Sequence, residues 1–397
     1  MFIIDILKYP TLSSLAFAIY RSNFYREDYK IPLIEGDIFN FIKKGYTGGA
    51  VDIYKPSSPK GDKVFRYDVN SLYPNSMKEF NMPIDNPTYF EGDLALLNED
   101  SGYNLSQRNK PFGFFEVEVN APLNMKIPLL QSKIKFGNGT ITIAPVGTWT
   151  GIYFCEEIYN AEKYGYKFKK LRGYLFNKAN IFSEYVDFLY NLKVNSDKNS
   201  PDYTISKLLL NCLYGRFGMN PVMENHLIIS NKELNKYYNN KTITNIIDLK
   251  NGKEWISFFD EVEWSEKSKN NLNISLPISA SITAYSRIHM SQFKTMKDIT
   301  LYYSDTDNID IDKPLNPKYV GKELGQMKLE HIFNDVVYLT PKVYGGITDN
   351  YEYVKIKGLK NPIKFNELKP LLYKDNKIEI PQEKWYRNIS EARSEVI

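Results

Sequence analysis

The stretch "LYYSDTDNIDID", Leu301–Asp312, carries four aspartates within eight residues, directly after a run of aromatic and aliphatic side chains. Because side chains alternate across a strand, Asp305 and Asp307 are predicted to point to the same side of one strand. Two carboxylates at that spacing repel each other unless a cation lies between them. Two alternatives stay open: a polar hairpin tip, which is the commoner origin of such a pair, or a cation site. Asp310 and Asp312 are expected to be solvated strand residues.

The side chains available as ligands limit which metal ions the chain could bind. Cys155 and Cys212 are the only cysteines and form no Cys-x-x-Cys motif, and the three histidines are isolated. Disulfide frameworks, cysteine zinc sites and the His-Glu-x-x-His motif are therefore excluded. An EF-hand calcium loop would need Gly where Asp310 stands and Glu where Asn316 stands. Any metal is expected to have oxygen ligands, as Mg²⁺, Mn²⁺ and Ca²⁺ prefer.

Length and charge set broad limits on the class of protein. The 397 residues are enough for two or three subdomains, and the net charge of +4 permits a nucleic-acid partner without establishing one. No apolar stretch reaches the roughly 18 residues of a membrane span, so no membrane partner is expected. The first residues lack the features of a secretory leader and of an Arg-rich presequence. The chain is expected to act in the compartment where it is made.

Hydrophobic patterning predicts the main elements. Helices are expected over 180–194, 203–218 and 274–296. Residues 81–177 are predicted to be rich in strands, and 221–272 to form a small polar insertion with short strands.

A second acidic position follows a different apolar strand. The stretch "FRYDVNSLYPNSM", Phe65–Met77, has one aspartate, Asp68, at the end of the strand, followed by a turn and a short helix. Pro74 suits the first turn of that helix, where its missing N–H costs nothing. Alone, such an aspartate is more often a turn or cap residue.

A third stretch, "KLLLNCLYGRFG", combines a core face with an ordered polar face. Lys207, Asn211 and Tyr214 recur at helical spacing and are predicted to share one face, while the leucines form the buried face. The leucines expected in the core are Leu208, Leu209 and Leu213. A cation, an amide and a flat ring suit a phosphate, a polar edge and a base pair, which a purely structural helix would not explain.

These three stretches, in this order, resemble motifs A, B and C of family B DNA polymerases. "DVNSLYPNSM" resembles Asp-x-x-Ser-Leu-Tyr-Pro, "KLLLNCLYG" resembles Lys-x-x-x-Asn-Ser-x-Tyr-Gly, and "YSDTDN" resembles Tyr-x-Asp-Thr-Asp-Ser. "YTGG" before motif A, and "PKVYGG" and "VKIKGLK" after motif C, resemble further elements of the same family. The resemblance covers roughly residues 30–375.

The spacing resembles the protein-primed branch of bacteriophages, adenoviruses and linear plasmids. Asp68 and Lys193 are 125 residues apart, and Gly215 and Asp305 are 90 apart, which leaves room for the two insertions of that branch. Cys212 and Asn308 stand where the family motifs usually have Ser. The 45 residues before "YTGG" are too few for the family's exonuclease, so the chain is expected to be a polymerase half.

The resemblance implies a metal site for two Mg²⁺ or Mn²⁺ ions. Asp68 and Asp307 would bridge the ions, with the Val69 carbonyl as a further ligand, and Asp305 would be a secondary acid. The implied reaction is transfer of a deoxynucleotide to a primer 3′-hydroxyl, in which the protein mainly positions groups and neutralises charge.

The resemblance also implies binding residues for dNTPs and for primer-template DNA. The nucleotide-binding set is Ser71, Leu72, Tyr73, Lys193, Lys207, Asn211 and Tyr214. In this set Tyr73 would exclude a 2′-hydroxyl, and Asn211 and Tyr214 would form the floor beneath the new base pair. The DNA-binding set is Tyr46, Gly48 and Gly49 on the template, and Lys342, Tyr344, Lys355 and Lys357 on the primer.

The implied fold class is α+β, with the right-hand polymerase architecture. An antiparallel-sheet palm, helical fingers, two insertions and a short thumb are expected, and no exonuclease domain. The expected segments are a remnant of the exonuclease–polymerase linker (1–45), palm (46–80 and 275–340), a β-rich insertion with part of the palm (81–177), fingers (178–220), a second insertion (221–274) and a partial thumb or primer-binding tail (341–397).

The resemblance further implies protein-primed replication of a linear plasmid or similar element, a terminal protein as a partner, and a mitochondrial location, with a cytoplasmic or viral one as the alternative. Two other functions compete with this interpretation. A metal-dependent glycosyltransferase would explain Asp305 and Asp307, but not the other motifs, and the sequence lacks its βαβ series. A non-catalytic, DNA-binding remnant of a polymerase stays open, although the acidic and basic motif residues are intact.

Overall fold

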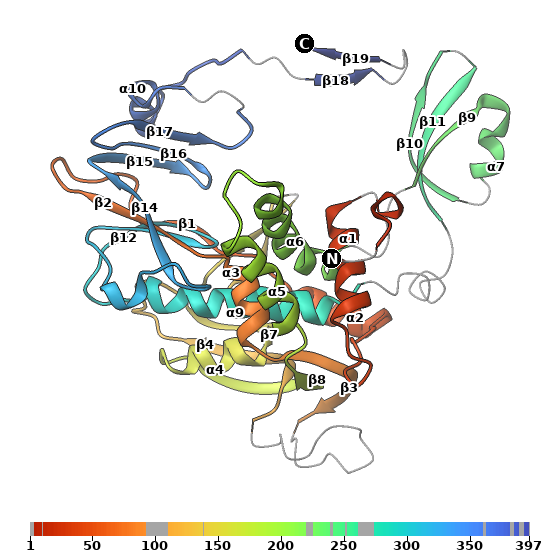
Figure 1. Cartoon of the computed structure of the whole chain (residues 1–397), viewed down its shortest axis with the longest axis horizontal. Helices are drawn as coiled ribbons and strands as arrows, with labels where there is room; N and C mark the ends of the chain where they lie inside the picture. The colour runs from red at the N-terminus through yellow and green to blue at the C-terminus, as the bar shows by residue number, and fades with distance from the viewer. Residues whose placement is uncertain are drawn as a thin grey trace. The chain divides into compact units, whose positions relative to one another are not determined.

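The structure is a computed structural model of the chain (Figure 1). It describes residues 4–9, 11–92, 110–137, 139–219, 225–238, 241–250, 252–260, 274–359, 363–381, 385–388 and 393–396. Parts of the predicted segments 81–177, 221–274 and 341–397 therefore lie outside the described residues. The chain divides into two compact units, the first made of Met1–Gly218 with Asn273–Lys374 and the second of Met219–Leu272 with Asp375–Ile397.

The first unit is built around a five-stranded antiparallel sheet, here called the central sheet. Its strand order is β1 (Val51–Ile53), β12 (Leu301–Asp305), β13 (Asn308–Ile311), β2 (Val64–Val69), β14 (Met327–Phe333). Two segments more than 230 residues apart in sequence are thereby neighbours: Asn308 of β13 lies opposite Asp68 of β2. The central sheet is antiparallel, and the unit also contains helices, as predicted for the α+β class.

The turn between β12 and β13 corrects one prediction. Asp305 ends β12 and pairs with Asn308, and Thr306 has a left-handed backbone with φ of 59°. Asp305 and Asp307 therefore do not alternate along one strand; Asp307 lies in the two-residue turn of a hairpin. The amide of Thr306 donates to the Ala50 carbonyl at 2.9 Å, which ties the turn to the residue before β1. A Cβ on Gly49 would lie 2.6 Å from Thr306 side-chain atoms, so a glycine is needed there.

A second sheet confirms the strand-rich character of residues 81–177. Its order is β3 (Met82–Glu91), β8 (Lys167–Ala179), β4 (Gly113–Ala121), β7 (Gly147–Phe154), and α4 (Cys155–Glu162) follows β7 directly. A separate hairpin, β5 (Ser132–Phe136) with β6 (Gly139–Ile143), lies within the same segment.

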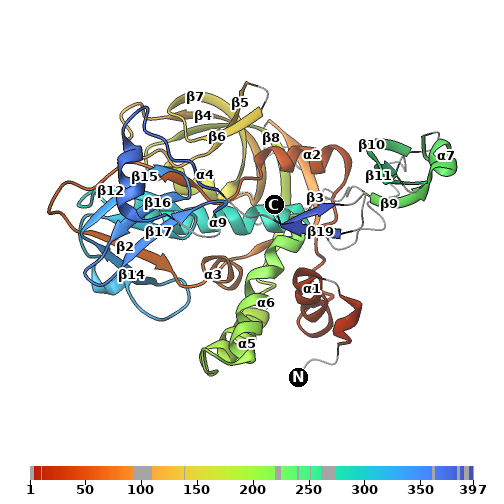
Figure 2. The same ribbon diagram turned by 90° about the horizontal axis from the view of Figure 1, so that it is seen from above.

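The long helix α9 (Leu276–Lys294) runs through the first unit (Figure 2). Its side chains contribute to two hydrophobic cores. Its first half, to Tyr285, packs in the large core with α6 and the four-stranded sheet. Met290 and Phe293 near its end belong to a smaller core with Tyr67 and Ile309 of the central sheet. The helix is covered on nearly every side, which explains its run of small and apolar residues.

Among the residues described, the helical layer of this unit includes five further helices. They are α1 (Leu12–Asn23), α2 (Gly36–Gly45), α3 (Leu72–Glu79), α5 (Ser183–Val194) and α6 (Pro201–Phe217). Helix α6 begins with Ser200 as N-cap and Pro201 as its first residue, and Gly218 follows its last residue, so both ends follow sequence rules.

The buried stripe of α6 differs in one residue from the prediction. Leu209 and Leu213 are buried as expected, whereas Leu208 is 39% exposed and Leu210 is buried in its place. The reason is that α6 packs against both α1 and α5, so the covered side is turned toward Leu210.

A three-stranded sheet follows the central sheet in sequence. It consists of β15 (Asp335–Thr340), β16 (Val343–Ile347) and β17 (Glu352–Ile356), packed on α10 (Phe365–Leu368). The Tyr338 amide donates to the Pro56 carbonyl at 2.8 Å, which joins this sheet to the segment between β1 and β2.

The second unit contains the short strands predicted for residues 221–272. Strands β9 (Asn225–Ser230), β10 (Lys241–Asp248) and β11 (Lys253–Asp260) form an antiparallel sheet, with α7 (Leu234–Tyr238) between the first two. Strands β18 (Trp385–Asn388) and β19 (Arg393–Val396) form a separate hairpin. Of the helices in the described ranges, none combines the length and the apolar character required to cross a membrane.

Candidate active site

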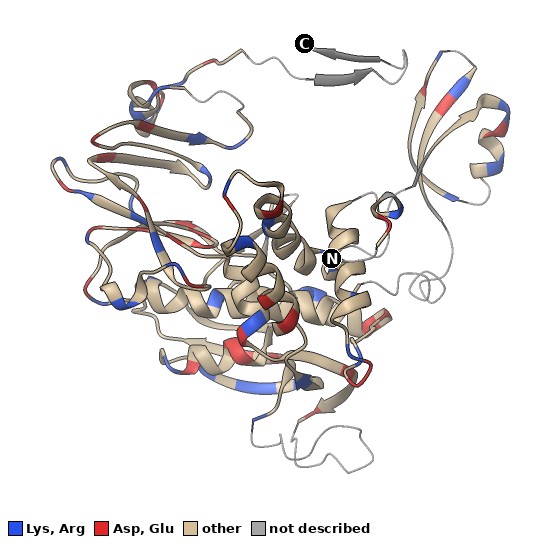
Figure 3. Ribbon diagram, in the orientation of Figure 1, with Lys and Arg blue, Asp and Glu red and all other residues tan. Residues whose placement is uncertain are grey.

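An open cleft with about 1520 Å³ of empty space lies in the first unit, over the end of β2 and the β12–β13 turn. Its basic residues are Arg66 of β2, Lys342 just before β16, and Lys355 and Lys357 at the end of β17. Figure 3 shows that further Lys and Arg residues lie along β8 in the four-stranded sheet. The cleft brings together predicted residues from five separate stretches: Asp68, Tyr73, Tyr214, Asp305, Asp307, Lys342, Tyr344, Lys355 and Lys357.

Asp68 and Asp307 form the acidic floor of the cleft. The Val69 amide donates to the Asp307 carbonyl at 2.8 Å, so the ends of the two segments are held together. Burial, with Asp307 and Glu330 nearby, raises the pKa of Asp68 to about 7. Burial and Asp305 also raise the pKa of Asp307. A divalent cation between the two carboxylates would offset this cost of ionisation.

The donor set fits a cation that shares its coordination with a substrate. Among the residues that the structure describes, no three His, Cys, Asp or Glu side chains are grouped to hold a metal. Two carboxylates and a backbone carbonyl suit Mg²⁺, which commonly uses one or two protein carboxylates together with water and substrate phosphates.

Asp305 has a cationic partner of its own. Lys342 Nζ lies 2.7 and 2.8 Å from its two oxygens, and the Tyr303 hydroxyl donates to it at 3.2 Å. Asp305 is therefore paired with a cation, although it lies near enough to Asp307 that burial and Asp305 together raise the pKa of that carboxyl. Lys342, predicted as a primer contact, lies within the same cleft but binds Asp305 here.

The start of α3 gathers the groups predicted to bind a nucleotide. Ser71 precedes the helix with a left-handed φ of 54°, and Lys193 Nζ donates to its hydroxyl at 3.2 Å. Burial, together with Lys207 nearby, lowers the pKa of Lys193. The side chain of Leu72 is buried, so only its backbone is available to a ligand.

Two tyrosines from motifs A and B meet face to face. The rings of Tyr73 and Tyr214 stack at 4.1 Å between centroids with 26° between their planes. Asn211 and Lys207 are exposed on the same face of α6 as Tyr214, as the helical spacing predicts. The stacked pair therefore lines the cleft beside Asp68 and Asp307, and Tyr214 connects it to α6.

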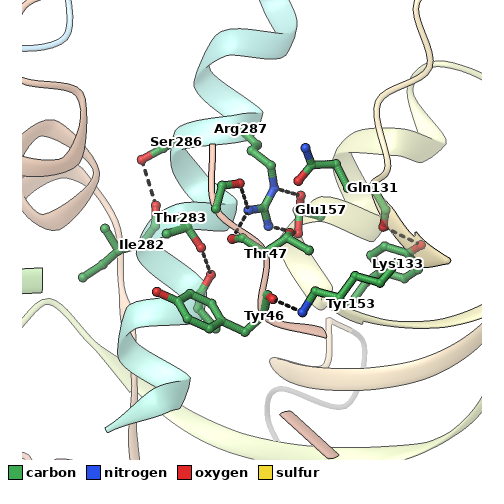
Figure 4. A network of polar contacts seen from close by, with 12 residues as sticks. Tyr46, Thr47, Gln131, Lys133, Tyr153, Glu157, Ile282, Thr283, Ser286 and Arg287 are labelled. Carbon is green, nitrogen blue, oxygen red and sulfur yellow. Dashed lines mark hydrogen bonds and ion pairs between the residues drawn. The ribbon is translucent and has the colours of Figure 1, made fainter. Parts of the chain in front are cut away.

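A polar network that the sequence did not reveal holds the loop of Tyr46–Gly49 (Figure 4). The Arg287 guanidinium donates to the carbonyls of Thr47 and Gly48 at 2.6 and 2.9 Å, and to both oxygens of Glu157 at 2.8 and 2.7 Å. Lys133 Nζ donates to the Tyr46 carbonyl at 2.6 Å. The only sequence signal for Arg287 was a cation in the middle of a helix of mostly small and apolar residues.

The two glycines of this loop differ in their surroundings. Gly48 faces open space, whereas Gly49 lies against Thr306 of the β12–β13 turn. The loop is thus packed against the acidic hairpin. Tyr46 reaches back to α9, where its hydroxyl lies 3.1 Å from that of Ser279.

The prediction that Asp310 is a solvated strand residue is wrong, whereas Asp312, just after the end of β13, keeps part of its surface exposed. Asp310 is fully buried, receives a hydrogen bond from the Tyr338 hydroxyl at 2.6 Å and lies 3.5 Å from Arg66 Nε. Asp312 is half-buried and accepts from the Thr300 amide at 2.9 Å. Asp310 is buried because β13 is an interior strand of the central sheet, paired on both sides with β12 and β2.

Comparison with known proteins now defines the family. Residues 1–299 match the family model described as DNA polymerase type B, organellar and viral. A protein from Neurospora intermedia named "Probable DNA polymerase" is 45% identical over 98% of this chain, and the DNA polymerase of Bacillus phage Nf is 26% identical over 76% of it. This chain belongs to the organellar and viral type B DNA polymerases.

The chain is shorter than these relatives. It spans 40% of the Neurospora protein and 49% of the phage Nf protein. The solved structure of Phi29 DNA polymerase with primer-template DNA and incoming nucleotide is similar in fold, with a TM-score of 0.69 and 19% identity over 98% of this chain and 67% of that one.

Proposed function

We propose that this chain carries the active site of a DNA-directed DNA polymerase, which transfers a deoxynucleotide from a dNTP to a primer 3′-hydroxyl. One observation carries the proposal: Asp68 and Asp307, 239 residues apart in the sequence, meet on the floor of one cleft. Family membership and the similarity of fold to Phi29 DNA polymerase support it.

Separate sets of residues would hold the metal ions and bind the triphosphate of the dNTP. Asp68, Asp307 and the Val69 carbonyl would hold two Mg²⁺ or Mn²⁺ ions, with Asp305 as a secondary acid. When bound, the ions would stabilise the negative charge on the attacking and leaving oxygens. The Ser71 turn, with Leu72 contributing its backbone, and Lys193 and Lys207 would bind the triphosphate.

The stacked tyrosines and the basic strands have complementary roles. Tyr73 would lie under the sugar and exclude a 2′-hydroxyl, while Tyr214 and Asn211 would support the new base pair. Lys342, Tyr344, Lys355 and Lys357 would bind the primer, and the Tyr46–Gly49 loop the template. Binding carried by Lys residues weakens steeply with salt, so a flat salt dependence of DNA affinity would contradict this assignment.

The segments of the chain are assigned accordingly. Residues 46–80 and 275–340 would form the palm around the central sheet, and 178–220 the fingers. Residues 81–177 and 221–274 would be insertions, with part of the palm in the first of them, and 341–397 would supply a primer-binding thumb segment. Residues 1–45 would belong to the linker before the palm.

The biological setting is proposed from the relatives. Similarity to phage DNA polymerases such as that of Bacillus phage Nf supports protein-primed replication of a linear plasmid or similar element, with a terminal protein as primer. Membership of the organellar and viral type B family, together with a fungal relative, supports a mitochondrial element as the template.

Primer extension tests the proposed function. The chain would be given a primed single-stranded template, dNTPs and Mg²⁺ or Mn²⁺, and compared with Asp307→Ala, Asp68→Ala and Asp298→Ala, an exposed aspartate outside the cleft. Loss of metal ligation should slow extension at least about a thousandfold, whereas Asp298→Ala should leave the rate unchanged. Extension that survives Asp307→Ala would disprove the assigned site, and salt-sensitive DNA binding without any extension would indicate a non-catalytic remnant.

A further inference from the structure

Arg66 and Asp310 form a buried ion pair directly beneath the cleft. Arg66 of β2 is 2% exposed and lies opposite Asp310 of β13, which is fully buried. Arg66 Nε and Asp310 Oδ1 are 3.5 Å apart, longer than a good charged hydrogen bond. A buried pair with such geometry contributes little to stability, which raises the question of what else it does.

The guanidinium of Arg66 interacts mainly with aromatic rings. Within the described part of the chain, its two terminal nitrogens are buried and find no hydrogen-bond acceptor. Instead, Arg66 Cζ lies 4.3 Å from the centroid of the Tyr344 ring and 5.8 Å from that of Tyr303. A planar, delocalised guanidinium can stack flat against such a ring, which the compact ammonium of Lys cannot do.

The rings of Tyr303 and Tyr344 connect Arg66 to the residues that are proposed to bind the primer. The Tyr303 hydroxyl donates to Asp305 at 3.2 Å and accepts from the Lys342 amide at 3.1 Å. Tyr303 and Tyr338 stack at 5.1 Å, and the Tyr338 hydroxyl donates to Asp310. One buried cluster therefore supports both Lys342 and Tyr344.

We propose that Arg66, held by Asp310, is a positioning residue for the primer end. Its guanidinium fixes the Tyr344 ring and, through Tyr303, the Lys342–Asp305 pair. Arg66 precedes Asp68 by two residues on the same strand, so it lies on the same face of the central sheet. Arg66 thereby fixes the positions of Lys342 and Tyr344 relative to Asp68 and Asp307. The inference rests on the proposed function of this cleft.

The test removes the whole charge pair, because removing one partner alone would leave a buried charge and could unfold the chain. Arg66→Met with Asp310→Asn is compared with Tyr344→Leu, with the combination of all three, and with Arg66→Lys. The matched control is Arg172→Met with Glu116→Gln, an exposed arginine–carboxylate pair between β8 and β4. Extension is measured as a function of primer-template concentration, at saturating dNTP.

The pair variant should raise the KM for primer-template about tenfold with a much smaller change in kcat, and the control should change neither. Arg66→Lys should stay impaired, because lysine keeps the charge but not the flat surface. Adding Tyr344→Leu to the pair variant should have no further effect. An unchanged KM in the folded pair variant, or full additivity with Tyr344→Leu, would overturn the proposal.

A second readout separates this inference from the proposed function. In the free chain labelled with 3-fluorotyrosine, the ¹⁹F signal of Tyr344 is identified by its loss in Tyr344→Phe. The pair variant should shift or broaden that signal, and the control should not. A shifted signal in a wild-type chain that fails to extend primers would support the positioning of Tyr344 while the polymerase function fails. An unmoved signal would overturn the positioning role.

Discussion

Two buried arginine–carboxylate pairs lie in the first unit, and their hydrogen-bonding groups are satisfied in different ways. Arg287 makes four hydrogen bonds of 2.6 to 2.9 Å, two to Glu157 and two to loop carbonyls. Arg66 has one contact of 3.5 Å with Asp310 and otherwise faces aromatic rings. The first pair holds a backbone loop in place through saturated hydrogen bonding. The second pair supports aromatic side chains, because the Arg66 guanidinium contacts the faces of their rings. Such contacts depend on the fit of two flat surfaces rather than on hydrogen-bond geometry.

Breaking the saturated pair should have the largest effect on stability. Arg287→Met leaves Glu157, which is 5% exposed, without its cation, so the free energy of unfolding should fall by about 3–5 kcal/mol. Urea unfolding measures this loss, and Arg172→Met, in an exposed pair, is expected to change the free energy of unfolding far less. Equal losses in the two variants would remove the distinction between buried and exposed pairs.

Removing both members of each pair sharpens the comparison. Arg287→Met with Glu157→Gln should still cost about 1–2 kcal/mol, because the partly buried Thr47 carbonyl loses its donor. Arg66→Met with Asp310→Asn should cost less than about 1 kcal/mol, because the side-chain amide introduced at position 310 can still accept the hydrogen bond from Tyr338. Unfolding curves of the two double variants decide the order, and a reversed order would contradict this account of the two pairs.

Lys193 is a third partly buried cation, and its partner is a hydroxyl rather than a carboxylate. Because burial and Lys207 already disfavour its charge, Lys193→Met should leave the free energy of unfolding nearly unchanged. The KM for dNTP should rise about tenfold if the charge serves the triphosphate. Lys198→Met, at an exposed lysine in the neighbouring loop, is the control in the same extension assay. A stability loss without a change in KM would reassign Lys193 to structure.

The smallest expected effect is a pH dependence from His289. Burial lowers the pKa of His289 below its ordinary value of 6.5, against the opposing effect of its hydrogen bond with the Gly325 carbonyl. The folded state thus favours the neutral ring, so stability is present above pH 6.5 and is lost as the pH falls below it. Between pH 7.5 and 5 the wild type should lose more of its free energy of unfolding than His289→Gln does in urea titrations. A larger loss in the variant would mean that another group is responsible.

Much of the site was predictable because its signals are local. Strand, turn and helix propensities placed Asp68 at a strand end and Tyr214 on one face of a capped helix, and the structure has both. The Asp305–Asp307 arrangement was only partly predicted, because strict alternation fails where a left-handed Thr306 turns the chain. Lys193, which the family resemblance implied as a nucleotide-binding residue, is brought by the fold to the Ser71 hydroxyl of motif A.

The partners of buried charges were not predictable. Asp310 reads as a polar strand residue in the sequence, and it is buried because β13 lies between two other strands. Arg287 and Glu157 are 130 residues apart, and no local pattern relates them. Glu330 lines the cleft from β14, at an irregularity in the pairing with β2 that sequence periodicity does not indicate.

The sequence by itself determined the family, the acidic and basic motif residues and the kinds of elements that carry them, because those depend on side chains a few positions apart. The tertiary structure alone decided which carboxylates meet, which charges are buried and which arginine holds which loop or ring. Those outcomes depend on strand pairing and helix packing between segments more than a hundred residues apart, where the order of neighbours in space is set by the whole core.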